Sequence, residues 1–89
     1  MKTIAIVIRG KVQGVFYRKT AKDKARELGL TGWVRNEDDG SVRIEVSGEE
    51  KNLEQLVKWC AEGPPRAVVT EVQVTDLPYH NFAQFISER

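Results

Sequence analysis

Hydrophobic and polar residues alternate along several short segments of the chain, a pattern typical of strands that bury one face. The clearest segment spans residues 41–47, where Val42, Ile44 and Val46 alternate with polar or charged neighbours. A second spans residues 3–9, where isoleucine occupies positions 4, 6 and 8. The alternation predicts four strands and a short fifth edge strand, over residues 3–9, 31–35, 41–47, 68–76 and 82–86.

Two other segments carry apolar residues at the spacing of one helix face. The first predicts a helix over residues 18–28, followed by Gly29 at the position of a left-handed helix cap. The second predicts a helix that begins with a capping box formed by Ser47 and Glu50 and ends at residues 63–65, Gly-Pro-Pro. The supporting apolar positions are Ala21, Ala25 and Leu28 in the first helix and Leu53, Leu56, Val57 and Cys60 in the second.

The order of these elements predicts an α+β fold. Two strand-helix-strand units with right-handed crossovers would interleave into one antiparallel sheet with both helices on a single face, the ferredoxin-like βαββαβ arrangement. Between the second and third strands, Asp38, Asp39 and Gly40 are typical of a hairpin turn. The chain has 89 residues, enough for one modest core, so we expect a single domain over residues 1–89. This fold carries many functions and predicts no chemistry by itself.

The charge balance and the scarcity of cysteine and histidine argue against several functional classes. Fourteen basic and thirteen acidic residues give a net charge of +1, which argues against a dedicated nucleic-acid binder. Cys60 is the only cysteine and His80 the only histidine, so we expect no intrachain disulfide and no cysteine-rich zinc site, and a metal cluster has few ligands to start from. We also expect no cofactor. No apolar run approaches the ~20 residues of a membrane span, and no signal-peptide pattern precedes Thr3. We therefore expect a soluble, cytoplasmic monomer without a nucleic-acid or membrane partner.

The segment from Gly10 to Arg18, Gly-Lys-Val-Gln-Gly-Val-Phe-Tyr-Arg, gives the strongest indication of a functional site. It runs directly from a predicted strand into a predicted helix, and Gly10 and Gly14 bracket the loop. Such loops turn backbone amides inward and bind an anion, most often phosphate, where the helix dipole adds positive charge. Arg18 would supply a planar, permanently charged fork for phosphate oxygens. On spacing alone, an equally good reading is that the glycines only permit a tight turn. Arg18 could be a solvated residue of the first helical turn, but a cation there is unfavourable unless an anion binds, which favours a functional role.

Several neighbouring residues admit simple structural roles. Asn36 closes a predicted strand and by its own pattern indicates a turn residue. Asp38 and Asp39 are adjacent to Gly40, so we expect turn formers rather than a catalytic carboxylate pair. Trp33 is expected in the core or as a packing lid.

Phe16 and Tyr17 would either anchor the loop or contact the part of a ligand beyond its phosphate. Lys19, Lys22 and Lys24 are expected to be solvated charges of the first helix, although Lys19 could add to the local positive field.

Two stretches together closely resemble the signature sequences of the acylphosphatases: residues 12–18, Val-Gln-Gly-Val-Phe-Tyr-Arg, and residues 32–42, Gly-Trp-Val-Arg-Asn-Glu-Asp-Asp-Gly-Ser-Val. The resemblance extends over essentially the whole chain, including the order of the strands. It implies an enzyme that hydrolyses the carboxyl-phosphate anhydride of a small acyl phosphate to a carboxylate and inorganic phosphate, without a metal.

The resemblance also implies a role for individual residues. Arg18 matches the family's phosphate-binding arginine, and Asn36 matches its water-orienting asparagine. It is this resemblance, not periodicity or spacing, that makes Asn36 a candidate catalytic residue. The amides that match the phosphate cradle, and so form the expected substrate-binding residues, are those of Gln13, Gly14, Val15, Phe16 and Tyr17.

Three other functions fit parts of the pattern. A small binding module could hold a phosphorylated ligand without turnover, although simple binding would not need a water-orienting asparagine. A sheet of this architecture can bind single-stranded RNA, but its central strands then usually carry exposed aromatic residues, which residues 3–9 and 41–47 lack. Related domains also occur inside larger carbamoyl-transfer enzymes. The sequence indicates no specific pocket for an acyl group, so we expect broad substrate tolerance.

Overall fold

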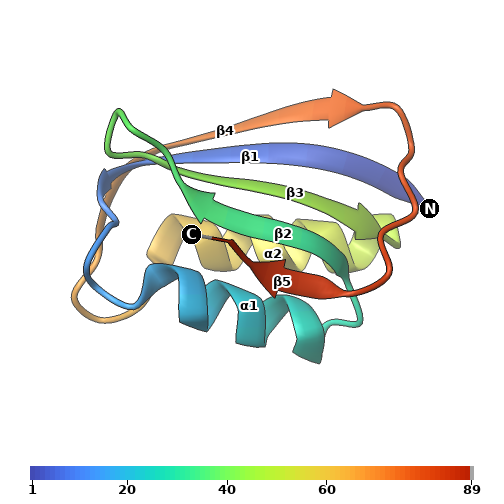
Figure 1. Cartoon of the computed structure of the whole chain (residues 1–89), viewed down its shortest axis with the longest axis horizontal. Helices are drawn as coiled ribbons and strands as arrows, with labels where there is room; N and C mark the ends of the chain where they lie inside the picture. Colours follow the sequence, from blue (N-terminus) through green and yellow to red (C-terminus); the bar gives the residue numbers. More distant parts are fainter. Residues whose placement is uncertain (89) are drawn as a thin grey trace.

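The computed structural model describes residues 1–88 and has two layers, a five-stranded sheet and a pair of helices (Figure 1). Both helices lie on the same face of the sheet, as the ferredoxin-like prediction requires. The elements in chain order are β1 (Lys2–Lys11), α1 (Tyr17–Glu27), β2 (Thr31–Asn36), β3 (Val42–Gly48), α2 (Glu50–Glu62), β4 (Val68–Leu77) and β5 (Phe85–Ser87).

The strands are arranged in the order β4-β1-β3-β2-β5. The first four pair antiparallel with their neighbours, which confirms the predicted core of the sheet. The prediction of an entirely antiparallel sheet is wrong for β5, which pairs parallel with β2. After β4 the chain reverses direction and crosses to the opposite edge, and a strand that runs opposite to β4 runs in the same direction as β2 (Figure 1).

The predicted capping box at the start of the second helix is wrong. Ser47 lies within β3, and its hydroxyl donates to the backbone carbonyl of His80 at 2.6 Å and lies 2.6 Å from the Thr3 hydroxyl. Glu49 is the residue at the N-cap, and it makes no side-chain capping bond. The Ser47 side chain is buried against residues distant in sequence, so local spacing could not reveal its partners.

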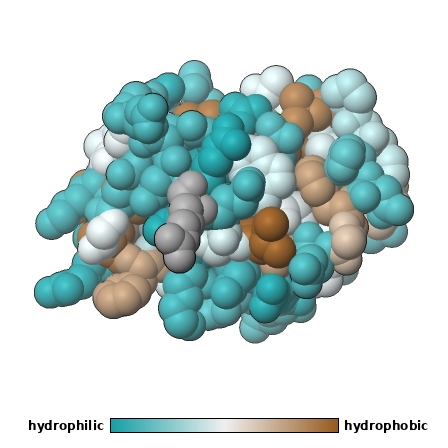
Figure 2. All heavy atoms as spheres, in the orientation of Figure 1, coloured by the Kyte–Doolittle hydropathy of each residue, from teal (hydrophilic) through white to brown (hydrophobic). Residues whose placement is uncertain are grey.

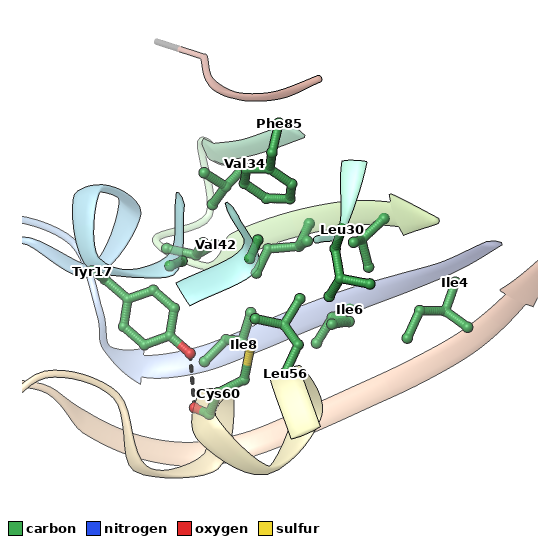
Figure 3. Packing of buried hydrophobic residues seen from close by; sticks show 14 of the residues in the cluster. Ile4, Ile6, Ile8, Tyr17, Leu30, Val34, Val42, Leu56, Cys60 and Phe85 are labelled. Carbon is green, nitrogen blue, oxygen red and sulfur yellow. Dashed lines mark hydrogen bonds between the residues drawn. The ribbon is translucent and has the colours of Figure 1, made fainter. Parts of the chain in front are cut away.

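The core fills the space between the sheet and the helices (Figure 3). It contains the isoleucines of β1 and the alternating aliphatic residues of β3, as their pattern predicts. Cys60 is fully buried among them, and His80 lies in the loop before β5, both as expected. Trp33 is only partly buried, and the Arg35 guanidinium lies over its ring, 4.6 Å from the ring centroid.

The strands β1, β2 and β5 have their C-terminal ends on the same side of the sheet. Because β2 and β5 run parallel to each other and both run in the direction of β1, the chain leaves all three strands on one side. A bulge between Arg9 and Gly10 shifts the register at the end of β1. A Cβ at Gly10 would overlap the backbone carbonyl of Val68, so this close approach requires glycine. The topology thus gathers the loop after β1, Asn36 and Ser87 in one place.

Candidate active site

An open cavity of about 460 Å³ lies at the C-terminal ends of β1, β2 and β5. The loop after β1 and the first turns of α1 complete its walls. Its charged lining residues are all cationic, because none of the residues that line it is acidic. An anion is therefore the ligand that the cavity favours electrostatically. The residues that line it are Val12, Gly14, Phe16, Tyr17, Arg18, Lys19, Lys22, Asn36 and Ser87.

The loop after β1 presents unpaired backbone amides at the start of α1. Gly14 and Phe16 adopt left-handed backbone conformations, with φ angles of 73° and 65°. Phe16 is the N-cap of α1, and its carbonyl accepts from the amide of Thr20 at 3.1 Å. In the part of the chain that the structure describes, no amide of residues 14–19 donates to a protein acceptor. Such orphan amides and the dipole of α1 favour an anion at this point.

Arg18 enters the cavity from the first turn of α1, which contains no acidic residue. One of its terminal nitrogens donates to the backbone carbonyl of Glu88, just after β5. Glu88 in turn donates its amide to the carbonyl of Val34 in β2 at 2.7 Å. The guanidinium is thus oriented by the C-terminal segment, and a bidentate contact with an anion would use its other N–H groups.

Asn36 is the last residue of β2 and lines the same cavity. Its Oδ1 atom is buried and has no hydrogen-bond partner among the described residues. The turn that follows is closed by other groups: the Glu37 amide donates to the Ser41 carbonyl, and the Gly40 amide donates to the Glu37 carbonyl. The Asn36 side-chain oxygen therefore does not stabilise the turn by a hydrogen bond, and its lack of a partner needs another explanation.

The two aspartates of the hairpin act as turn residues, as predicted. The Oδ1 atom of Asp39 accepts from the amide and the hydroxyl of Ser41, and its Oδ2 atom pairs with Arg9 at 3.0 Å. The bonds from Ser41 and the contact with Arg9 hold the pKa of the Asp39 carboxyl well below its usual value. Neither Asp38 nor Asp39 lines the cavity.

Gln13 and Val15, two of the expected substrate-binding residues, are not among the residues that line the cavity. The Gln13 side-chain amide donates to the backbone carbonyls of Glu37 and Ser41, both at 2.9 Å, and so joins the loop to the hairpin after β2. Val15 is buried in the core. Their expected contribution to the cradle was that of backbone amides, and the structural role of the Gln13 side chain was not predicted from the sequence.

Tyr17 anchors the loop to the core and to α2. Its hydroxyl donates to the carbonyl of Cys60 in α2 at 2.7 Å (Figure 3). Its ring centroid lies 5.2 Å from that of Trp59. Burial raises the pKa of Tyr17 above its usual range and raises the pKa of the Cys60 thiol to about 12. Both groups therefore stay protonated near neutral pH, and neither is suited to act as a base or nucleophile.

Sequence reasoning did not place Ser87 or Lys22 in the site. Ser87 reaches the cavity only because β5 pairs with β2. The sequence predicts a solvated helix residue at Lys22, but Lys22 follows Arg18 by four positions and so shares its helix face. Within residues 1–88, no group of three or more His, Cys, Asp or Glu side chains could hold a metal ion, and no helix is long and apolar enough to cross a membrane.

The fold and this cavity define a small α+β domain with a cavity lined by cationic residues at the start of its first helix. The acylphosphatase family profile matches residues 4–86. An acylphosphatase of Marinobacter nauticus is 58% identical over 73 residues, which cover 82% of this chain and 79% of that protein. The chain belongs to the acylphosphatase family of enzymes.

Solved structures agree with this assignment. The crystal structure of acylphosphatase from Bacillus subtilis is 33% identical, with a TM-score of 0.97 and complete coverage of both chains. The crystal structure of full-length HypF in the phosphate- and nucleotide-bound form is 31% identical, with a TM-score of 0.88. That match covers 99% of this chain but 12% of HypF, so the similar part is a small share of the longer chain.

Proposed function

We propose that the chain hydrolyses the carboxyl-phosphate anhydride of small acyl phosphates and needs no metal ion or cofactor to do so. The observation that carries this proposal is that Asn36, whose Oδ1 is buried and unpaired, lines the same cavity as Arg18 and the orphan amides after β1. A phosphate oxygen does not pair with this acceptor, because the two oxygens repel each other, whereas the Nδ2 group of the same side chain could donate to a phosphate. The proposal requires the Asn36 side chain to turn this oxygen toward the cavity, where a water molecule donates to it.

The phosphoryl group binds at the start of α1. Its oxygens accept from the amides that follow Gln13 and from the guanidinium of Arg18. These donors are fixed before the substrate arrives, because Tyr17 is held by Cys60 and the loop is joined to the hairpin by Gln13. Fixed donors stabilise the charge on the phosphoryl oxygens in the transition state without a cost of reorganisation.

The reaction needs mainly positioning and charge stabilisation. Asn36 Oδ1 accepts a hydrogen bond from the attacking water and aims the water oxygen at phosphorus, in line with the leaving oxygen. The water oxygen forms the new P–O bond as the bond between phosphorus and the acyl oxygen breaks. The bonding electrons leave with the carboxylate, which is a good leaving group and requires no strong acid. The proton of the water passes to a phosphoryl oxygen of the substrate.

The reaction is tested by following phosphate release from benzoyl phosphate in ¹⁸O-labelled water with EDTA present. The proposal predicts turnover with the label in inorganic phosphate, because the water attacks phosphorus. Absence of turnover would leave only an anion-binding domain, and label in benzoate would show attack at the carbonyl carbon.

We further propose that the enzyme acts as a monomer on free small molecules. Figure 2 supports this, since the face that it shows is mainly hydrophilic with scattered hydrophobic residues and no broad apolar patch. The cytoplasmic location stays a prediction from the sequence.

A further inference from the structure

The cavity is lined by more cationic side chains than the proposed reaction needs to bind the phosphoryl group. Arg18 and the amides of the loop already supply the donors for that group. Lys19 and Lys22 also line the cavity, from the next positions along α1. No acidic side chain of the lining offsets them.

The two lysines differ in their surroundings. Lys19 is paired with Asp23 at 3.0 Å, and its side chain is largely exposed, at 70%. Lys22 is half-buried and forms no ion pair with another residue of the range 1–88. Lys24, on another side of the helix, is paired with Glu27 at 3.0 Å and does not line the cavity. Lys22 is thus the α1 lysine whose charge is directed at the cavity without a carboxylate partner in the described chain.

The position of Lys22 also defines where a ligand charge would lie. Arg18 and Lys22 are four residues apart, so they share one face of α1 and repel each other slightly unless an anion lies between or beside them. One helical turn rises about 5.4 Å, so Lys22 lies roughly that far along α1 from the phosphate-binding end. An acyl group of the size of a benzoyl group spans this distance.

We propose that Lys22 forms a second anion subsite, so that the enzyme favours acyl phosphates whose acyl part carries its own anionic group. This inference rests on the proposed hydrolysis and specifies its substrate class. Lys22 is a specificity-determining residue: it contacts the far end of the acyl group and takes no part in the bonds that form and break. The preferred anionic group is a carboxylate or a phosphate, and both would accept from the ammonium group.

The test compares benzoyl phosphates that carry a carboxylate at the 4-position with their 4-methyl counterparts, in which the charge is absent and the shape is similar. The inference predicts that kcat/KM is higher for the carboxylate, and that Lys22→Gln lowers this preference about three- to fivefold, as expected for a partly exposed ion pair. Lys22→Arg should keep the preference. Lys58→Gln makes the same charge change on an exposed position of α2 outside the cavity and should not alter it. A comparison of kcat/KM for the 4-carboxylate and a 4-phosphono substrate shows which of the two anionic groups the subsite prefers.

Binding separates failure of this inference from failure of the proposed reaction. In phenacylphosphonates a CH₂ group replaces the bridging oxygen, so they cannot be hydrolysed. Tighter binding of the 4-carboxy than of the 4-methyl phenacylphosphonate, lost in Lys22→Gln, would support the subsite even if no substrate were turned over. Equal binding of the two compounds by the unmodified enzyme, or a preference that Lys22→Gln leaves intact, would overturn it.

Discussion

The side-chain amide of Gln13 donates to the backbone carbonyl of Glu37 at 2.9 Å and thereby joins the loop after β1 to the residue that follows Asn36. A second bond from the same nitrogen reaches the Ser41 carbonyl. The loop and the end of β2 are far apart in sequence and have no strand pairing with each other. Gln13 therefore helps to fix the position of Asn36 relative to the loop after β1, the two parts of the site to which we assign water positioning and phosphate binding.

Gln13→Ala should separate these two parts of the site without removing a group that touches substrate. We expect kcat to fall about tenfold with a smaller change in KM, because misplacement of the water affects the reacting geometry more than phosphate binding. Stability should fall by about 1 kcal/mol for the lost hydrogen bonds. Gln73→Ala, at an exposed position of β4, is the matched control. A rise in KM at constant kcat would instead assign Gln13 to substrate binding.

Arg18→Lys should fail almost as completely as Arg18→Ala. An ammonium group retains the charge but cannot give the paired, planar contact that a guanidinium gives to phosphoryl oxygens. We expect kcat/KM to fall about 10²- to 10³-fold in both variants, with a weaker competitive inhibition by inorganic phosphate. Steady-state kinetics with benzoyl phosphate measures both effects. Full activity of Arg18→Lys would show that charge alone suffices.

The buried thiol of Cys60 predicts a loss of stability in alkali. Its pKa is raised from 9.0 to about 12 by burial, so the unfolded chain releases this proton at lower pH than the folded protein. The stabilisation is complete below pH 9 and is lost as pH rises from about 9 to about 12, at up to ~1.4 kcal/mol per pH unit. Tyr17, whose pKa is also raised, adds to the loss above pH 10.

Urea unfolding at a series of pH values measures this slope. Cys60→Ala should lower stability at pH 7, because it leaves a small cavity in the core, but should flatten the decline above pH 9. An unchanged slope in this variant would show that other groups cause the alkaline loss.

The arrangement of the fold was largely predictable because its signals are local. Alternation in β1 and β3 and the helical spacing of Ala21 and Ala25 each match the face that the structure buries. The errors arose where partners distant in sequence decide the outcome. The hydroxyl of Ser47 bonds to Thr3 and His80 rather than capping α2, and β5 pairs parallel because of the path the chain takes after β4.

The parts of the site that lie in one continuous segment could be predicted from the sequence, and the parts that come from distant segments could not. Gly14 and Arg18 lie in a single loop and helix start, where the amide geometry follows from sequence. The pattern around Asn36 indicated only a turn, and its candidate role came from resemblance to a family. Its buried, unpaired Oδ1 depends on how β2 ends beside the loop, which spacing cannot show. Ser87 and the Gln13 bridge likewise exist only after folding.

The most direct test of the account compares Asn36→Ala with the unmodified enzyme in benzoyl phosphate hydrolysis and in binding of inorganic phosphate. Asn81→Ala, in the exposed loop before β5, controls for loss of an asparagine. The account predicts that Asn36→Ala lowers kcat at least about 10²-fold while phosphate binds within about threefold of normal, because Asn36 positions the water and not the phosphoryl group. Turnover by Asn36→Ala at the rate of the unmodified enzyme would contradict it.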